Sequence, residues 1–154
     1  MRFAADRMLG RLARWLRIIG QDVAYGPHLS GTSLVQTARR EGRVILTRDT
    51  RLVRRRGLPP HLFVNSDYFR EQFRQVVSTF DLRSPSGIMT RCLDCNQELR
   101  EADRLLVRHR VPPYVWATQD RFMTCCHCHR VFWSATHIGR IRAELKLLGI
   151  SIPG

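Results

Sequence analysis

The chain has few of the features that mark a membrane or secreted protein. No run of 18 or more apolar residues is present among its 154 residues, which excludes a membrane-spanning helix. Arginine interrupts the first apolar stretch at positions 7, 11, 14 and 17, so this stretch lacks the unbroken apolar segment of a secretory signal. We therefore expect a cytoplasmic protein whose cysteines stay reduced.

Lysine and acidic residues are scarce as well. Of the 26 basic residues only Lys146 is a lysine, and they outnumber the 13 acidic residues, which gives a formal net charge of +13. A codon bias would explain arginine in place of lysine, but it would not explain the excess of basic over acidic residues. Because such a surface repels itself and attracts polyanions, we expect a nucleic-acid partner in preference to a merely solvated basic surface.

The first eighty residues alternate short apolar runs with helical periods. We expect strands at 2–5, 22–25, 44–46 and 61–64, and helices at 8–19, 33–42 and 69–80. Gly20 and Gly42 end the first two helices, and Ser33 with Gln36 forms a capping box that starts the second. This order predicts an α/β fold, with a mainly parallel sheet covered by helices.

Residues 81–87 have the composition of a linker, and the sequence changes character beyond them. We expect one domain over residues 1–82 and a second over residues 88–150, ending in a helix near 138–148. The chain is long enough for one full core and a small appendage, but not for two full cores.

Four cysteines predict one structural zinc ion in the second domain. Cys92 and Cys95 form one Cys-x-x-Cys pair, and Cys125 and Cys128 form another. Two such turns complete a tetrahedron of thiolates with no open position, which is the pattern of a zinc ribbon. The 29 intervening residues exceed the usual spacer, so we expect an extra hairpin or loop there, bent at Pro112–Pro113.

Other ligands for this zinc are conceivable from the sequence. Cys126 is left over, and His127, His129 or His137 could replace one sulfur. The alternative without metal is five unrelated thiols, which makes the paired spacing a coincidence.

Three aspartates follow predicted strands: Asp6 the first, Asp49 the third and Asp67 the fourth. The carboxyl ends of adjacent parallel strands converge at one edge of the sheet, where carboxylates tolerate one another mainly around cations such as Mg²⁺ or Mn²⁺. Two such ions can activate a water and stabilise the leaving oxygen of a phosphodiester. As alternatives, Asp6 and Asp67 could be helix N-caps, whereas Asp49 has no obvious capping role.

Arginines near these acids are candidates for phosphate contacts. Arg11 and Arg14 share one face of the first helix, and Arg48 precedes Asp49; the alternative is a solvated surface. Gly10 interrupts the same helix, which suggests a close approach by another backbone or a ligand.

Four motifs resemble those of the Mut7-C family, and together they cover nearly the whole chain. They are the stretch 3–17 (FAADRMLGRLARWLR), the stretch 42–49 (GRVILTRD), Cys92-x-x-Cys95-Asn96, and Phe122-x-x-Cys125-x-x-Cys128-x-Arg130-Val131-Phe132-Trp133 followed by His137.

The resemblance implies a shortened PIN-like nuclease domain followed by a zinc ribbon. Carried over by motif, Asp6 and Asp49 would hold a catalytic divalent cation, Mg²⁺ or Mn²⁺, with Asp67 as the third acid. PIN nucleases usually supply a further acid from a helix in the middle of the domain, and residues 25–40 contain none.

We therefore expect a metal-dependent ribonuclease whose ribbon contributes structure and binds RNA or a partner. The alternative is a non-catalytic module that binds RNA or a ribonucleoprotein on the same scaffold. A toxin-like nuclease held by an acidic antitoxin is a third possibility. The sequence identifies no protein partner, RNA substrate or oligomeric state.

Overall fold

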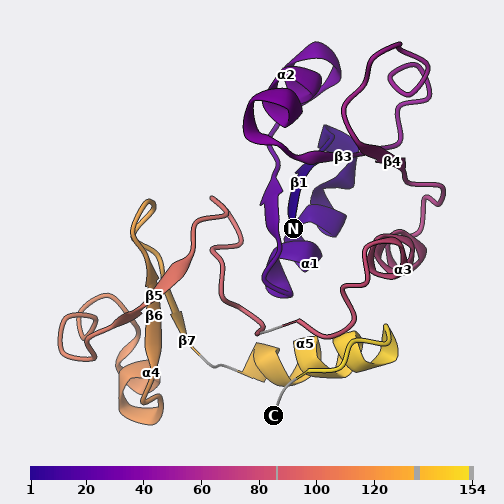
Figure 1. Ribbon diagram of the computed structural model, residues 1–154. Coiled ribbons are helices and arrows are strands. Elements are labelled where there is room, and N and C mark those ends of the chain that lie inside the picture. The colour runs from indigo at the N-terminus through magenta and orange to yellow at the C-terminus, as the bar shows by residue number, and fades with distance from the viewer. Residues whose placement is uncertain (86, 134–135, 153–154) are drawn as a thin grey trace.

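A four-stranded parallel sheet forms the N-terminal part of the protein in the computed structural model (Figure 1). The structure describes residues 1–85, 87–133 and 136–152, apart from the side chains of residues 136 and 137. The strands are β1 (Arg2–Ala5), β2 (Asp22–Ala24), β3 (Val44–Thr47) and β4 (His61–Phe63). Their order is β2-β1-β3-β4, and every pairing is parallel, which confirms the predicted α/β sheet.

Two of the three predicted helices connect strands of this sheet, and the third follows β4. A short 3₁₀ turn, η1 (Arg7–Leu9), leads into α1 (Gly10–Ile18); α2 (Gly31–Glu41) and α3 (Phe69–Thr79) follow. Gly20 and Gly42 lie just beyond α1 and α2 with φ of 80° and 61°. Only glycine adopts this left-handed conformation at little cost, so both predicted stops are confirmed.

The predicted N-cap of α2 is wrong by three residues. Ser30, not Ser33, is the N-cap, and the backbone N–H of Ser30 donates to Ser33 Oγ at 3.2 Å. The capping box therefore pairs two serines, and Ser33 holds the inner position that the prediction gave to Gln36.

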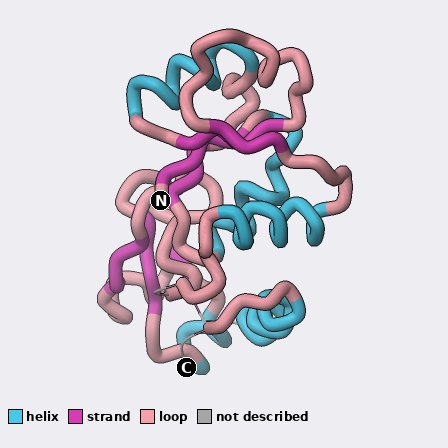
Figure 2. Tube along the Cα trace, turned by 45° about the vertical axis from the view of Figure 1, so that its right-hand side comes forward, coloured by secondary structure: helices cyan, strands magenta, loops and turns pink. Residues whose placement is uncertain are grey.

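Successive side chains of each strand point to opposite faces of the sheet, and helices cover both faces. On one face, Ala4 and Ile45 pack against Leu34 of α2. On the other face, Phe3 packs in one cluster with residues of α1 and α3, including Phe73. Figure 2 shows the sheet lying between α2 and the pair formed by α1 and α3.

The C-terminal part contains a three-stranded antiparallel sheet, β5 (Leu99–Ala102), β6 (Phe122–Cys125) and β7 (Val131–Trp133). The first Cys-x-x-Cys turn precedes β5, and the second connects β6 to β7. The long spacer forms the two strands β5 and β6 and, between them, α4 (Pro113–Thr118). Pro113 occupies the first turn of α4, where a missing N–H costs nothing. This arrangement is compatible with the predicted zinc ribbon, and the expected insertion contains the helix α4, which begins at the two prolines, and not only a hairpin or loop.

The last helix, α5 (Thr136–Leu147), returns to the first sheet (Figure 1). Leu145 and the following Leu148 and Ile150 are buried in the cluster that contains Phe3. The predicted second domain, 88–150, groups this helix with the ribbon, although Ile141 and Leu145 of the helix pack in the core of the sheet. None of the described helices has the length and apolarity needed to cross a membrane.

Candidate functional site

Asp6 lies at the end of β1, where the strand order reverses between β1 and β3. Open parallel sheets bind ligands at such a point, outside the carboxyl ends of the strands. Only 4% of Asp6 is exposed, and three groups donate to its carboxylate. The backbone N–H of Met8 donates to Oδ1 at 2.9 Å, while Thr47 Oγ and the N–H of Arg48 donate to Oδ2 at 2.6 and 2.9 Å. Asp6 therefore caps η1, as the alternative interpretation proposed, and joins β1 to β3.

Asp49 holds the turn after β3, which corrects the expectation that it has no capping role. Its Oδ1 accepts from the N–H groups of Arg51 and Leu52 at 2.8 and 3.1 Å, and its own N–H donates to Thr47 Oγ at 3.0 Å. Thr47 thus connects the two acids. This hydroxyl was missed by sequence reasoning, although a threonine ending an aliphatic strand was a usable signal.

One open cavity of about 500 Å³ contains both acids in its wall. The other lining residues are Arg7, Met8, Ser30, Gly31, Thr47, Arg48, Thr50, Arg51 and Leu52. Carboxylate oxygens are the ligands that Mg²⁺ prefers, and Mg²⁺ is commonly held by one or two carboxylates plus substrate phosphates. Three arginines in the same wall favour an anionic ligand. The cavity therefore combines cation ligands with phosphate-attracting side chains.

Asp67 is placed differently from the other two acids. It does not line the cavity, its side chain is 86% exposed, and it pairs with Arg48 at 2.6 Å. Arg48 also donates to the carbonyl of Val64 at 2.7 Å. The N-cap of α3 is Tyr68, whose N–H donates to Ser66 Oγ, so Asp67 does not cap that helix. Within the described residues, no three carboxylates lie within ligand distance of one another. The role of all three acids stays a prediction.

The two helical arginines that we predicted to bind RNA also lie apart. Arg11 stacks on the ring of Phe69, 4.5 Å from its centroid, whereas Arg14 lines a separate cavity beside the ribbon. Gly10 is explained by a side chain and not by a backbone or ligand. A Cβ at Gly10 would lie 2.5 Å from the hydroxyl of Tyr25, which donates to the carbonyl of Arg7. A larger residue at position 10 would therefore require Tyr25 to shift.

The four predicted zinc ligands form one compact group. Their sulfurs lie within 4.8 Å of one another, with 3.6 Å between Cys92 and Cys128 and 3.2 Å between Cys95 and Cys125. Sulfurs bound to a tetrahedral zinc at about 2.3 Å are separated by roughly 3.8 Å. The donor set and its spacing therefore suit zinc, so this cluster can bind the ion.

The thiols of this cluster affect one another. Burial acts to raise the pKa of Cys125, but hydrogen bonds from the backbone of Cys128, the thiol of Cys95 and the backbone of His127 lower it to about 6. Burial and the neighbouring thiols raise the pKa of Cys95 to about 12. Thiols packed this closely resist losing all their protons together without a cation, and zinc supplies the compensating charge.

The alternative ligands are not part of this group. Cys126 is exposed, and neither His127 nor His129 belongs to the cluster. The side chain of His137 lies outside the described residues. The all-cysteine set is therefore the interpretation that the described residues support.

Arg17 connects the parallel sheet to the Cys92–Cys95 turn, which we call the first zinc turn because it holds two of the four predicted ligands. Sequence reasoning assigned Arg17 no role. Its buried guanidinium donates twice to the carbonyl of Val23, at 3.0 and 2.7 Å, and to the carbonyls of Leu93 and Asp94 at 2.7 and 3.0 Å. Asn96 adds a second connection, because its side chain accepts from the N–H of Val23 at 3.0 Å. Burial lowers the pKa of Arg17, and the neighbouring cysteines act in the opposite direction.

Comparison with protein families gives one match, which covers almost the whole chain. The model of the Mut7-C RNAse domain matches residues 1–145. Comparison with curated proteins and with solved structures finds no match. The family match spans both the acid-lined cavity and the four cysteines.

Proposed function

We propose that this chain, which belongs to the Mut7-C RNAse domain family, is a metal-dependent ribonuclease acting at the cavity lined by Asp6 and Asp49. The family points to a ribonuclease-type hydrolase with RNA as its substrate. The observation that carries the proposal is the pairing of two acids with three arginines at the reversal point of the sheet. The same composition suits a phosphodiester held by a divalent cation.

Each part of the cavity has a separate task in this proposal. Asp6 and Asp49 hold Mg²⁺ or Mn²⁺, which when bound supplies an activated water and stabilises the leaving oxygen. Arg7 and Arg51 attract the RNA backbone. Arg48 already neutralises Asp67, so recruiting Asp67 as a third acid requires that the 2.6 Å ion pair open. The released Arg48 could then contact phosphate.

The alternative is a non-catalytic module that binds RNA on the same scaffold, and two observations favour it. The carboxylate of Asp6 is already occupied by three donors, and Asp67 points to Arg48 and not to the cavity. In this alternative the acids stabilise the turns after β1 and β3, and the basic surface binds RNA without cleaving it. We propose a cytoplasmic location in either case, because zinc thiolates stay reduced there.

Cleavage of 5′-labelled single-stranded RNA distinguishes these functions. We expect the wild-type protein to cleave with added Mn²⁺ and not without it. Asp49→Asn should lower the cleavage rate at least about 100-fold, because removing one electrostatic contact to the reacting groups typically costs this much. Asn keeps an oxygen that can accept from Arg51 and Leu52, so the turn should persist. Asp120→Asn, at an exposed aspartate of the ribbon insertion, is the matched control. RNA binding without cleavage by freshly purified wild type would favour the non-catalytic module.

A further inference from the structure

A second concave surface lies on the ribbon, away from the acid-lined cavity. A cavity of about 420 Å³ is lined by Ile88, Met89, Thr90, Leu99, Arg121, Met123, Phe132, Trp133 and Ile138. A neighbouring cavity of about 280 Å³ is lined by Arg14, Met89, Leu93, Val131, Phe132, Trp133, Ile138 and Ile141. The two share Met89, Phe132, Trp133 and Ile138, so they are the halves of one feature. We call it the ribbon groove.

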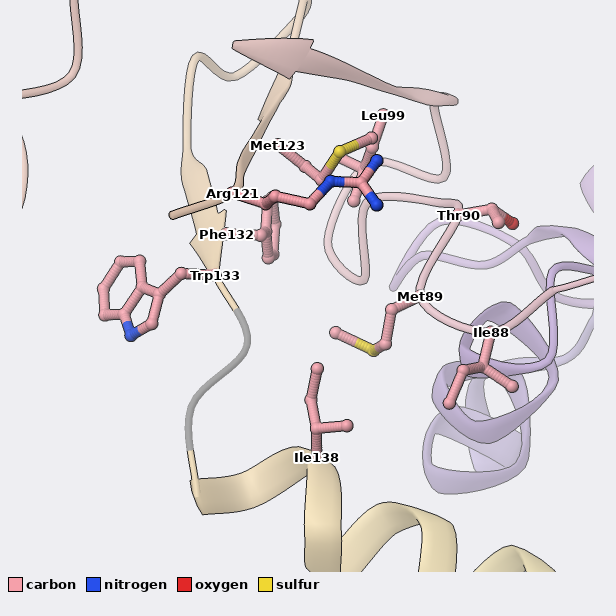
Figure 3. Close-up of a pocket in the computed structure, with 9 residues that line it drawn as sticks. All are labelled: Ile88, Met89, Thr90, Leu99, Arg121, Met123, Phe132, Trp133 and Ile138. Atoms are coloured by element: carbon pink, nitrogen blue, oxygen red, sulfur yellow. The ribbon is translucent and has the colours of Figure 1, made fainter. Parts of the chain in front are cut away.

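The ribbon groove is apolar along its length and has one arginine in the lining of each half. Figure 3 shows Met89 and Ile138 pointing toward each other across the larger half, with Phe132 and Arg121 on the ribbon side. Phe132 and Met89 are only partly buried, so their apolar surface stays open to a ligand. Arg121 is 79% exposed and contacts Glu101 at 3.2 Å. Arg14, from α1, lines the smaller half.

We propose that the ribbon groove binds a base of single-stranded RNA, stacked on Phe132, while Arg14 and Arg121 contact the flanking phosphates. Proteins bind single strands through this combination of an aromatic platform and basic residues that follow the backbone. Because every base has an aromatic face, such a site tolerates different sequences. The size is suitable, since small-ligand pockets occupy about 300 to 1,000 Å³.

The charge of the chain favours RNA over a protein segment as the occupant. A purely apolar protein segment would fill the groove but would offer no negative charge to Arg14 and Arg121 in its lining. The formal net charge of +13 attracts a polyanion to any face of the molecule. RNA can contact both the apolar lining and the two arginines. The choice of RNA as ligand rests on the proposed function.

The helix α1 joins the ribbon groove to the acid-lined cavity. Asp6 precedes η1 and lines that cavity, whereas Arg14 lies further along α1 and lines the groove. The rise of a 3₁₀ turn followed by an α-helix separates these residues by roughly 13 Å along the axis. A strand anchored in the groove can therefore run along α1, and the anchored base would set which phosphate reaches the acids.

Fluorescence anisotropy with 5′-fluorescein octauridylate tests the groove, in buffer without Mg²⁺ or Mn²⁺ so that binding is measured without cleavage. Phe132→Leu should weaken binding about 5-fold or more, because a stacked base is worth about 1 to 3 kcal/mol. Phe132→Tyr keeps an aromatic ring and should stay within about 2-fold of wild type. Zinc content should be measured for both variants, because Phe132 also packs against the cysteine cluster.

Arg121→Ala provides a test that does not depend on the ribbon core. We expect it to lower affinity and to reduce the slope of log affinity against log salt by about 0.7, the value for one phosphate contact with a single strand. Arg100→Ala is the control, because Arg100 is exposed on β5 next to Leu99 and therefore on the opposite face of the sheet. Octauridylate containing 4-thiouridine should crosslink to peptides that contain Met89 or Phe132.

Unchanged affinity in both Phe132→Leu and Arg121→Ala, with crosslinks only outside the groove, would overturn the proposal and leave a protein segment as the occupant. The proposed function fails separately. Weaker binding by the groove variants together with no cleavage by wild type would keep the groove and reject the nuclease. Cleavage by the wild type together with normal RNA binding by the groove variants would keep the nuclease and reject the groove.

Discussion

Arg17→Met should loosen the attachment of the zinc ribbon to the parallel sheet. Arg17 is 4% exposed and makes four hydrogen bonds to three carbonyls, which belong to Val23 on the sheet and to Leu93 and Asp94 in the first zinc turn. Methionine fills similar apolar space but donates no hydrogen bond. The substitution therefore removes the polar contacts and preserves most of the packing.

The structure sets the size of this effect. Val23 is fully buried, so its carbonyl loses both bonds from Arg17 without replacement by water, at a cost of about 1 to 3 kcal/mol. Leu93 is only partly buried and Asp94 is exposed, so water can replace much of what their carbonyls lose. The substitution also removes the desolvation penalty of the buried guanidinium, which offsets part of the lost hydrogen-bond energy. We expect the free energy of unfolding to fall by about 1 to 3 kcal/mol.

Urea unfolding of the zinc-loaded protein measures this loss, and release of zinc to a coloured chelator measures the state of the turn. Arg17→Met should lower the free energy of unfolding and speed zinc release, because the turn loses its support. Arg54→Met, at an exposed arginine after β3, is the control and should change neither. A loss below about 0.5 kcal/mol with unchanged zinc release would refute the argument, since that is the range of an ordinary surface substitution.

Two further predictions concern the zinc ion and the response to acid. Purified protein should contain one zinc per chain, and Cys125→Ser should lose it whereas Cys126→Ser should keep it; elemental analysis decides, and the reverse pattern would show that the wrong sulfur was assigned. Burial acts to raise the pKa of Asp22, but hydrogen bonds from Arg43 and Asn96 leave it lowered. A carboxyl with a lowered pKa stabilises the folded state above its unfolded pKa, and this contribution is lost as the pH falls from about 4 through the lower folded pKa. Asp22→Asn should therefore flatten this part of the pH dependence of the free energy of unfolding, and an unchanged profile would contradict the assignment.

Local patterns were sufficient to predict most of the fold. The strands and helices of the first eighty residues follow from their periodicity, and the left-handed glycines end α1 and α2 where expected. The four-cysteine cluster was also predictable, because each Cys-x-x-Cys turn is a local structure whose spacing is visible in the sequence.

Contacts between distant residues were not predictable in this way. Arg17 and Leu93 are 76 residues apart, and nothing in the apolar period of α1 marks Arg17 as buried. The orientation of Asp67 depends on Arg48, a neighbour that only the tertiary structure supplies. The turn held by Asp49 is local, but its sequence resembles an ordinary loop. Sequence reasoning could therefore name the three acids, but it could not show that Asp6 and Asp49 share a cavity that Asp67 does not line.

The melting temperature of the wild type and of Asp49→Asn, each with and without Mn²⁺, is the most direct test of the metal site at the centre of this account. A cation that binds only the folded state at 100 times its dissociation constant adds about 2.7 kcal/mol, and a chain of this size gains about 2 to 4 °C per kcal/mol. We predict that Mn²⁺ raises the wild-type midpoint by several degrees and leaves that of Asp49→Asn unchanged. Equal shifts for both proteins, or none for either, would contradict a cation site formed by Asp6 and Asp49.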